Sequence, residues 1–121
     1  MVNALFDTCI LIDYLNRIDA AKTEMTRYES RAISLITWME IMVGAAPDSE
    51  EKLRAWLNTF RVIAIDEKIA ARAVELRQKH RVKLPDAIVW ASAQAHSLLL
   101  VSRNTKDFSP DQPGVRVPYA L

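Results

Sequence analysis

The sequence predicts an α/β fold with a mostly parallel central sheet and helices on both faces. Short apolar segments, typical of buried strands, alternate with longer segments whose apolar residues recur at helical spacing. The chain has 121 residues, 50% hydrophobic and 26% charged, which is typical of one globular domain, here residues 1–121. It has only two glycines and no repeat, low-complexity tract or glycine–serine linker that would divide it.

The first half of the chain carries two predicted strands, at residues 2–6 and 31–36, both short and mostly apolar. Thr8 can cap the helix after the first strand, because a threonine hydroxyl can accept a hydrogen bond from a free backbone N–H at a helix start. Further helices are predicted over residues 19–28 and 37–44, the second ending in a glycine, a frequent C-terminal cap.

The rest of the chain carries further predicted helices and strands. Pro85 suits the first turn of a helix, where the missing N–H of proline costs nothing. The predicted elements are, in order, a helix opening at 47–49, a strand at 61–65, a helix after Asp66, a helix from Pro85 to about 97, a strand at 98–101, a loop at 102–113 and a short edge strand at 115–117.

Composition excludes several classes of protein. The single cysteine, Cys9, cannot form an internal disulfide, which favours a reducing cytoplasm. No basic leader precedes the first apolar stretch, so no signal peptide is expected. No apolar run approaches the roughly 20 residues that span a membrane. The net charge of +1 predicts no overall affinity for nucleic acid, so any such binding must come from local patches.

Four acids stand at the edges of apolar segments. Asp7 directly follows the first predicted strand, Glu40 lies in the first helical turn after the second, and Asp107 lies in the loop after the fourth. Asp86 opens a helix. Because ligands of open parallel sheets bind beyond the carboxyl ends of the strands, all four acids can reach one rim. Carboxylates suit Mg²⁺ or Mn²⁺, which activate water and offset charge on a phosphodiester.

No other chemistry competes with this interpretation in the sequence. There is no phosphate-binding glycine loop and no nucleophile elbow. Cys9, His80 and His96 lie far apart and lack the spacing of zinc ligands.

Each acid also has a plain structural explanation. Asp7 could be an acid at a helix start, where the helix dipole favours a negative charge. Asp86 could be an ordinary first-turn acid, and Asp107 could order a turn. Thr37 and Glu40 match a capping box, in which the glutamate returns to the threonine amide. On spacing alone, capping and metal binding explain Glu40 equally well. The functional case therefore depends on the four acids as a set.

A basic run precedes Asp86, and two more basic residues flank Asp107. The run could hold a phosphate backbone, or it could complement the dipole at the end of its helix. The candidate phosphate contacts are Arg77, Lys79, Arg81, Lys83, Arg103 and Lys106.

Taken in order, four blocks of the sequence resemble the PIN-domain ribonucleases, specifically the VapC-type toxins of bacterial toxin–antitoxin pairs. The blocks are LFDTCILIDYL (5–15), ITWME (36–40), LPDAIVWA (84–91) and LVSRNTKDF (100–108). Each block alone is weak, but together they span nearly the whole chain in the order of the family.

The resemblance implies a three-layer α/β/α sandwich that cleaves RNA endonucleolytically with Mg²⁺ or Mn²⁺. The catalytic and metal-binding acids of the family fall on Asp7, Glu40, Asp86 and Asp107, and its supporting polar residues on Thr8 and Asn104. It also shifts the interpretation of Glu40 toward the metal site. Cys9 departs from the asparagine usual there, and we expect activity to survive this change.

The resemblance also implies partners. Family members commonly form homodimers and are held inactive by a cognate, VapB-like antitoxin whose C-terminal segment enters the site. Pairing of two copies could use Trp56 or the helical faces around Tyr14 and Tyr28. One alternative function is a non-catalytic module whose acidic pocket binds a basic partner segment. Another is a nuclease that acts on structured DNA, although the small size favours RNA.

Overall fold

A five-stranded parallel sheet forms the centre of the fold in the computed structural model, which describes residues 3–121. The strand order is β3-β2-β1-β4-β5, and every neighbouring pair is parallel. The strands are β1 (Ala4–Phe6), β2 (Arg31–Ser34), β3 (Arg61–Ile63), β4 (Leu99–Val101) and β5 (Val115–Arg116). The predicted parallel sheet is confirmed, and the first residue of the predicted strand 2–6 lies outside the described part of the chain.

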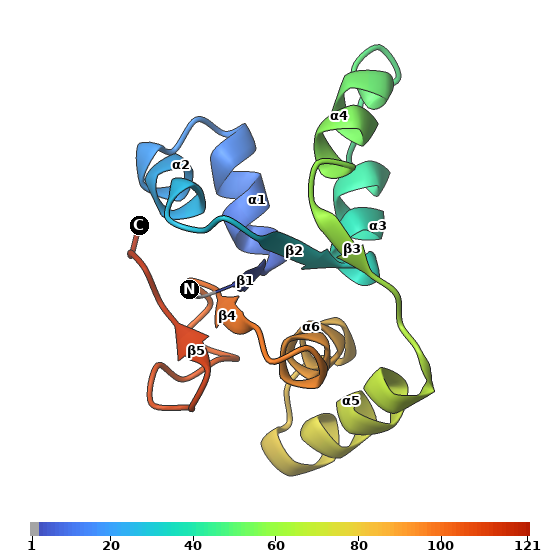
Figure 1. Ribbon diagram of the computed structural model, residues 1–121, viewed down its shortest axis with the longest axis vertical. Coiled ribbons are helices and arrows are strands. Elements are labelled where there is room, and N and C mark those ends of the chain that lie inside the picture. The colour runs from blue at the N-terminus through green and yellow to red at the C-terminus, as the bar shows by residue number, and fades with distance from the viewer. Residues whose placement is uncertain (1–2) are drawn as a thin grey trace.

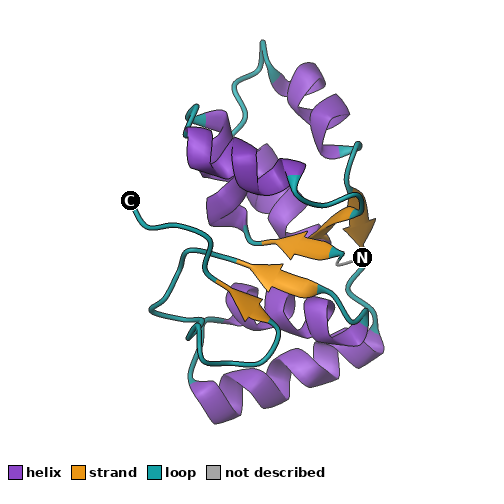
Figure 2. Ribbon diagram, turned by 60° about the vertical axis from the view of Figure 1, so that its left-hand side comes forward, coloured by secondary structure: helices purple, strands orange, loops and turns teal. Residues whose placement is uncertain are grey.

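Helices cover both faces of this sheet, as Figures 1 and 2 show. They are α1 (Thr8–Leu15), α2 (Asp19–Thr26), α3 (Leu35–Val43), α4 (Glu50–Leu57), α5 (Glu67–His80) and α6 (Leu84–Ala95). Helices α5 and α6 pack on one face, and α1 to α4 lie on the other. The predicted three-layer sandwich is therefore confirmed. Among residues 3–121, no helix is long and apolar enough to cross a membrane.

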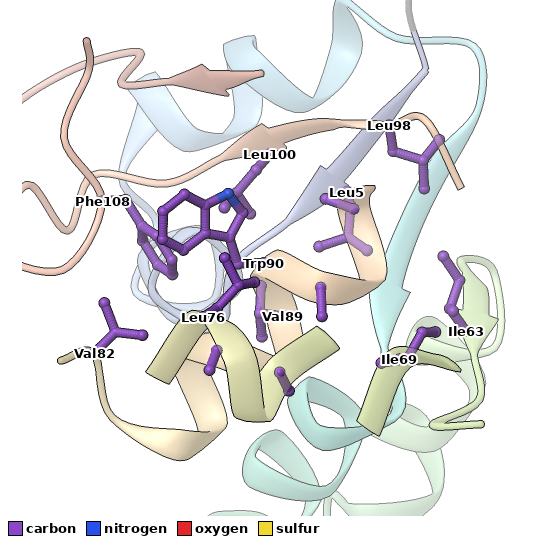
Figure 3. Packing of buried hydrophobic residues seen from close by; sticks show 14 of the residues in the cluster. Leu5, Ile63, Ile69, Leu76, Val82, Val89, Trp90, Leu98, Leu100 and Phe108 are labelled. Carbon is purple, nitrogen blue, oxygen red and sulfur yellow. The ribbon is translucent and has the colours of Figure 1, made fainter. Parts of the chain in front are cut away.

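Two separate hydrophobic cores result from the alternation of side chains along the strands. In β1, Leu5 faces the core under α5 and α6 (Figure 3), whereas Ala4 and Phe6 face the core under the other four helices. All three residues are fully buried. Adjacent strand residues point to opposite faces, so a strand covered on both sides reads as a continuous apolar run.

Two predicted helix starts are corrected by the capping contacts. Ser34 ends β2 and accepts a hydrogen bond from the Ile36 amide, so α3 begins at Leu35 rather than at Thr37. Asp7, not Thr8, caps α1, with its Oδ1 2.8 Å from the Thr8 amide nitrogen. In both cases an earlier short polar side chain satisfies the free N–H groups of the first turn.

The remaining boundaries differ from the predicted ones by a few residues at the ends, where local patterns are weakest. The predicted helix 19–28 ends two residues early, at Thr26, and the helix predicted from Pro85 to about 97 ends at Ala95. The predicted strand 61–65 likewise ends at Ile63, and Asp66 then caps α5 by accepting a hydrogen bond from the Ile69 amide.

A candidate acidic site at the carboxyl edge of the sheet

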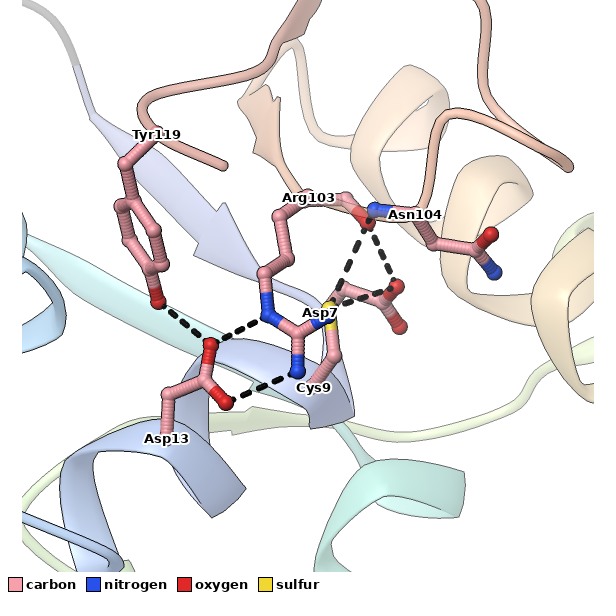
Figure 4. A network of polar contacts seen from close by, with 7 residues as sticks. Asp7, Cys9, Asp13, Arg103, Asn104 and Tyr119 are labelled. Atoms are coloured by element: carbon pink, nitrogen blue, oxygen red, sulfur yellow. Dashed lines mark hydrogen bonds and ion pairs between the residues drawn. The ribbon is translucent and has the colours of Figure 1, made fainter. Parts of the chain in front are cut away.

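Asp7 directly follows the carboxyl end of β1 and is almost fully buried, with 4% of its surface exposed. Its Oδ2 accepts a hydrogen bond of 2.7 Å from the hydroxyl of Ser102, which directly follows the neighbouring strand β4. The Cys9 thiol lies 3.6 Å from both the Asp7 carboxylate and the Ser102 hydroxyl (Figure 4). Burial raises the pKa of Asp7, although these hydrogen bonds oppose the shift.

Asp86 and Asp107 are brought together by an aromatic contact beneath them. Trp90, one turn after Asp86 on α6, packs edge-to-face against Phe108 with ring centroids 5.8 Å apart. Both aromatic side chains are buried, so the loop after β4 is held against the start of α6. Asn104 orients Asp107 by donating a hydrogen bond of 2.9 Å to its Oδ2.

The other three acids all lie close enough to Asp86 to affect its pKa. The pKa of Asp86 rises from 3.8 to about 7, first because of burial and then because of a hydrogen bond with Asp107. The negative charges of Asp7, Asp107 and Glu40 raise it further. The sheet edge therefore gathers the four acids that the sequence singled out.

Glu40 joins this group through Thr8 and not through a capping box. The Thr8 hydroxyl donates to Glu40 Oε1 at 2.8 Å and lies 3.0 Å from the Thr37 hydroxyl, so it links α1 to α3. Thr37 is fully buried inside α3 instead of capping it. The capping-box alternative for Glu40 does not apply, because the helix starts earlier, at Leu35, and the Glu40 residue is exposed at the rim.

The donor set fits a hard divalent cation in its chemistry. Carboxylate oxygens are the ligands that Mg²⁺ and Mn²⁺ prefer, and such an ion would relieve the repulsion that raises the Asp86 pKa. Within residues 3–121, no three acidic, histidine or cysteine side chains are already close enough together to hold a metal ion. An ion bound here would require the acids to draw closer together.

The stability of the metal-free protein is expected to fall as pH rises from about 4 to about 7. The folded state favours the protonated Asp86, so its stabilising contribution is full below the ordinary pKa and is lost as pH rises through the folded value near 7. Urea unfolding at pH 4, 5, 6 and 7 with EDTA measures this change, and Asp86→Asn should flatten it. A pH-independent free energy of unfolding in the native protein would contradict the expectation.

Five of the six predicted phosphate contacts fall into two groups. Lys79, Arg81, Lys83 and Lys106 are exposed, whereas Arg77 donates a hydrogen bond of 2.8 Å to the Val82 carbonyl beyond the end of α5. Arg77 thus stabilises the C-terminal end of the helix, which is the structural explanation for a basic residue there.

Arg103 belongs to neither group, because both ends of its guanidinium donate to the carboxylate of Asp13. Because these guanidinium nitrogens are bound to Asp13, they are not available to bind a phosphate. Sequence reasoning missed the pair and also missed the contact between Ser102 and Asp7. One signal was available, since Asp13 stands three residues after the buried Ile10 and so lies on the buried face of α1.

A comparison with known families matches residues 4–109 to the PIN domain. The chain therefore belongs to the PIN domain family, which confirms the predicted resemblance. It is 50% identical to a chain of the "Toxin-antitoxin complex from Klebsiella pneumoniae", with a TM-score of 0.93 over 98% of this chain and 100% of that one.

More distant structures share the fold alone. FitAcB from Neisseria gonorrhoeae is 22% identical, with a TM-score of 0.79 over 98% of this chain and 99% of that one. VapBC2 from Rickettsia felis, bound to a DNA fragment from its promoter, is also 22% identical, with a TM-score of 0.76 over 95% and 96%. A comparison with curated proteins finds no significant match.

Proposed function

We propose that this protein is a metal-dependent endoribonuclease and the toxin of a toxin–antitoxin pair. One observation carries the catalytic part of the proposal, namely that acids from three other segments, Asp7, Glu40 and Asp107, lie close enough to the partly buried Asp86 to raise its pKa beyond the effect of burial. Such strongly perturbed groups gather at sites that bind ions or do chemistry. Membership of the PIN domain family supports the nuclease, and the 50% identical chain from a toxin–antitoxin complex supports the toxin.

In this proposal Asp7, Asp86 and Asp107 would hold Mg²⁺ or Mn²⁺, and Glu40 would bind it directly or through water. The ion, when bound, supplies an acidified water and offsets charge on the phosphodiester. The neighbouring side chains orient the acids. Ser102 holds Asp7, the Thr8 hydroxyl holds Glu40, and Asn104 holds Asp107.

The RNA backbone would run over the exposed basic residues near the acids. Four residues suit this role and depend on long flexible stems rather than on preformed geometry: Lys79, Arg81, Lys83 and Lys106. We place this activity in the cytoplasm, where RNA is accessible and the half-buried thiol of Cys9 stays reduced.

The direct test incubates purified protein, free of any partner, with RNA and Mn²⁺. Cleavage that EDTA blocks would support the enzyme. The alternative, an acidic pocket that only binds a basic partner segment, predicts no cleavage at any metal concentration. Structured DNA in a parallel reaction separates the RNA-cleaving proposal from a DNA nuclease.

An exposed apolar strip offers a docking surface for the antitoxin. It consists of Ile12 and Leu15 on α1 and Met39 and Val43 on α3, with 44% to 87% of each side chain exposed. The strip starts beside Thr8 and Glu40 and leads to a groove of about 450 Å³ that Leu15, Leu53 and Trp56 line. An antitoxin segment lying along it would arrive at the acids, and exposed apolar patches of this kind mark interaction sites.

Val43→Asp is expected to weaken antitoxin binding at least about tenfold, because burial of this side chain would be lost and a charge placed in an apolar contact. Titration calorimetry with the cognate antitoxin measures the change. Val74→Asp, at a 50% exposed position on α5 outside the strip, is the matched control. Equal losses in both variants would exclude the strip as the docking surface.

Homodimer formation remains a prediction, but one of its candidate surfaces is corrected. Tyr28 is buried, with 8% exposed, and its hydroxyl donates to Glu24 at 2.7 Å. Tyr14 stacks on Trp56 with ring centroids 5.0 Å apart, and both rings are partly exposed. Tyr28 itself is therefore not available for pairing, whereas Tyr14 and Trp56 are, and Trp56 would then be shared with the groove proposed for the antitoxin. Sizing at micromolar concentration tests whether a homodimer forms.

A further inference from the structure

Arg103 stands next to site residues in the sequence, but its side chain extends to Asp13 on α1 (Figure 4). Its Nε and Nη2 donate to the two carboxylate oxygens of Asp13, with Nη2 2.9 Å from Oδ1. The hydroxyl of Tyr119 donates to the same carboxylate at 2.7 Å. Asp13 is only 3% exposed, so three donors from the C-terminal part of the chain satisfy a buried charge.

This contact adds to those that tie the loop after β4 to the start of α1. Ser102 donates a hydrogen bond to Asp7, which caps the start of α1. Arg103 donates to Asp13 further along the same helix. The loop then carries Asn104, which orients Asp107. Attachment at these two positions fixes both the distance and the relative orientation of α1 and the loop. A single attachment would leave the loop free to rotate about it.

We propose that Arg103 and Asp13 are positioning residues that set the geometry between Asp7 and Asp107. This inference rests on the proposed function, because it assigns the pair to the support of that same metal site. A planar guanidinium bound through two nitrogens imposes orientation as well as attraction, which a lysine ammonium cannot do. A buried ion pair contributes little to stability against an apolar replacement, so we assign this pair to orientation and not to stability.

The chain contains a matched control pair. Arg116 on β5 donates to both oxygens of Glu24 on α2, at 2.7 and 3.1 Å, and the Tyr28 hydroxyl adds a third bond. Glu24 is 4% exposed, and the side-chain exposure of Arg116 is 33% against 32% for Arg103. This second pair has the same chemistry and burial, but it contacts none of the four acids.

The experiment compares Arg103→Lys with Arg116→Lys in the full chain. Titration calorimetry with Mn²⁺, without RNA, should show about tenfold weaker binding for Arg103→Lys, as is usual when the support of a metal ligand is lost. Arg116→Lys should remain within about twofold of the native protein, even if both variants melt at similarly lower temperatures. Equal Mn²⁺ affinities in the two variants would overturn the proposal.

Hydrogen exchange of the metal-free protein separates this inference from the proposed function. The Asn104 amide donates to the Ser102 hydroxyl, and the Phe108 amide donates to the Asn104 carbonyl. Arg103→Lys should speed exchange at both amides, and Arg116→Lys should not. Unchanged exchange overturns the positioning role, whereas a native protein that binds no Mn²⁺ contradicts only the metal site. If Arg103→Lys does not fold, Tyr119→Phe removes one bond to Asp13 and should give a smaller change of the same sign.

Discussion

Asp86→Asn is expected to reduce Mn²⁺-dependent RNA cleavage by at least about 100-fold, equivalent to roughly 2.7 kcal/mol of transition-state stabilisation. Burial and three neighbouring acids disfavour the charged form of Asp86, and a bound cation would offset this effect. An amide keeps the shape of the side chain but offers the ion no charge. Initial rates of RNA cleavage at saturating Mn²⁺ measure the loss.

The same substitution should stabilise the metal-free protein at pH 8, because it removes a carboxylate that the folded state disfavours in its charged form. Asp7→Asn should abolish cleavage as well while keeping the fold, since an amide oxygen can still accept from the Thr8 amide. Glu51→Gln, an exposed acid on α4, is the control. Metal-dependent activity retained in both aspartate variants would refute the assignment of the site.

Phe108→Ala is expected to lower the free energy of unfolding by about 3–5 kcal/mol, the usual cost of deleting a fully buried aromatic side chain. It should also lower the pKa of Asp86 from about 7, because the contact with Trp90 holds the loop of Asp107 against α6. Urea unfolding measures the stability, and a carboxyl-carbon NMR titration of Asp86 measures the pKa.

Phe60→Ala separates the two effects. Phe60 is also buried, at 7% exposure, but it packs against Phe6 and Trp56 in the core on the opposite face of the sheet. It should cost a comparable free energy and leave the Asp86 pKa unchanged. If both variants shift the pKa equally, the aromatic contact does not govern the distance between Asp86 and Asp107.

The layered fold could be predicted because its signals are local. Strands buried on both faces read as apolar runs, and helices read as stripes, so the alternation of the two implied a parallel sheet. Asp7 directly follows such a run, and Ser102 and Asp107 follow another. Parallel strands share one carboxyl edge, which is why neighbouring acids could be assigned to it before any packing was known.

The sequence by itself thus determined the sheet, its layers and the four acids at one rim. Only the tertiary structure decided that Trp90 and Phe108 join Asp86 to Asp107, and that Arg103 binds Asp13 instead of facing a phosphate. Periodicity and capping motifs report neighbours within a few residues along the chain. Arg103 and Asp13 stand 90 residues apart, and their pairing depends on β4 lying next to β1, which brings the following loop to α1 and which no local pattern encodes.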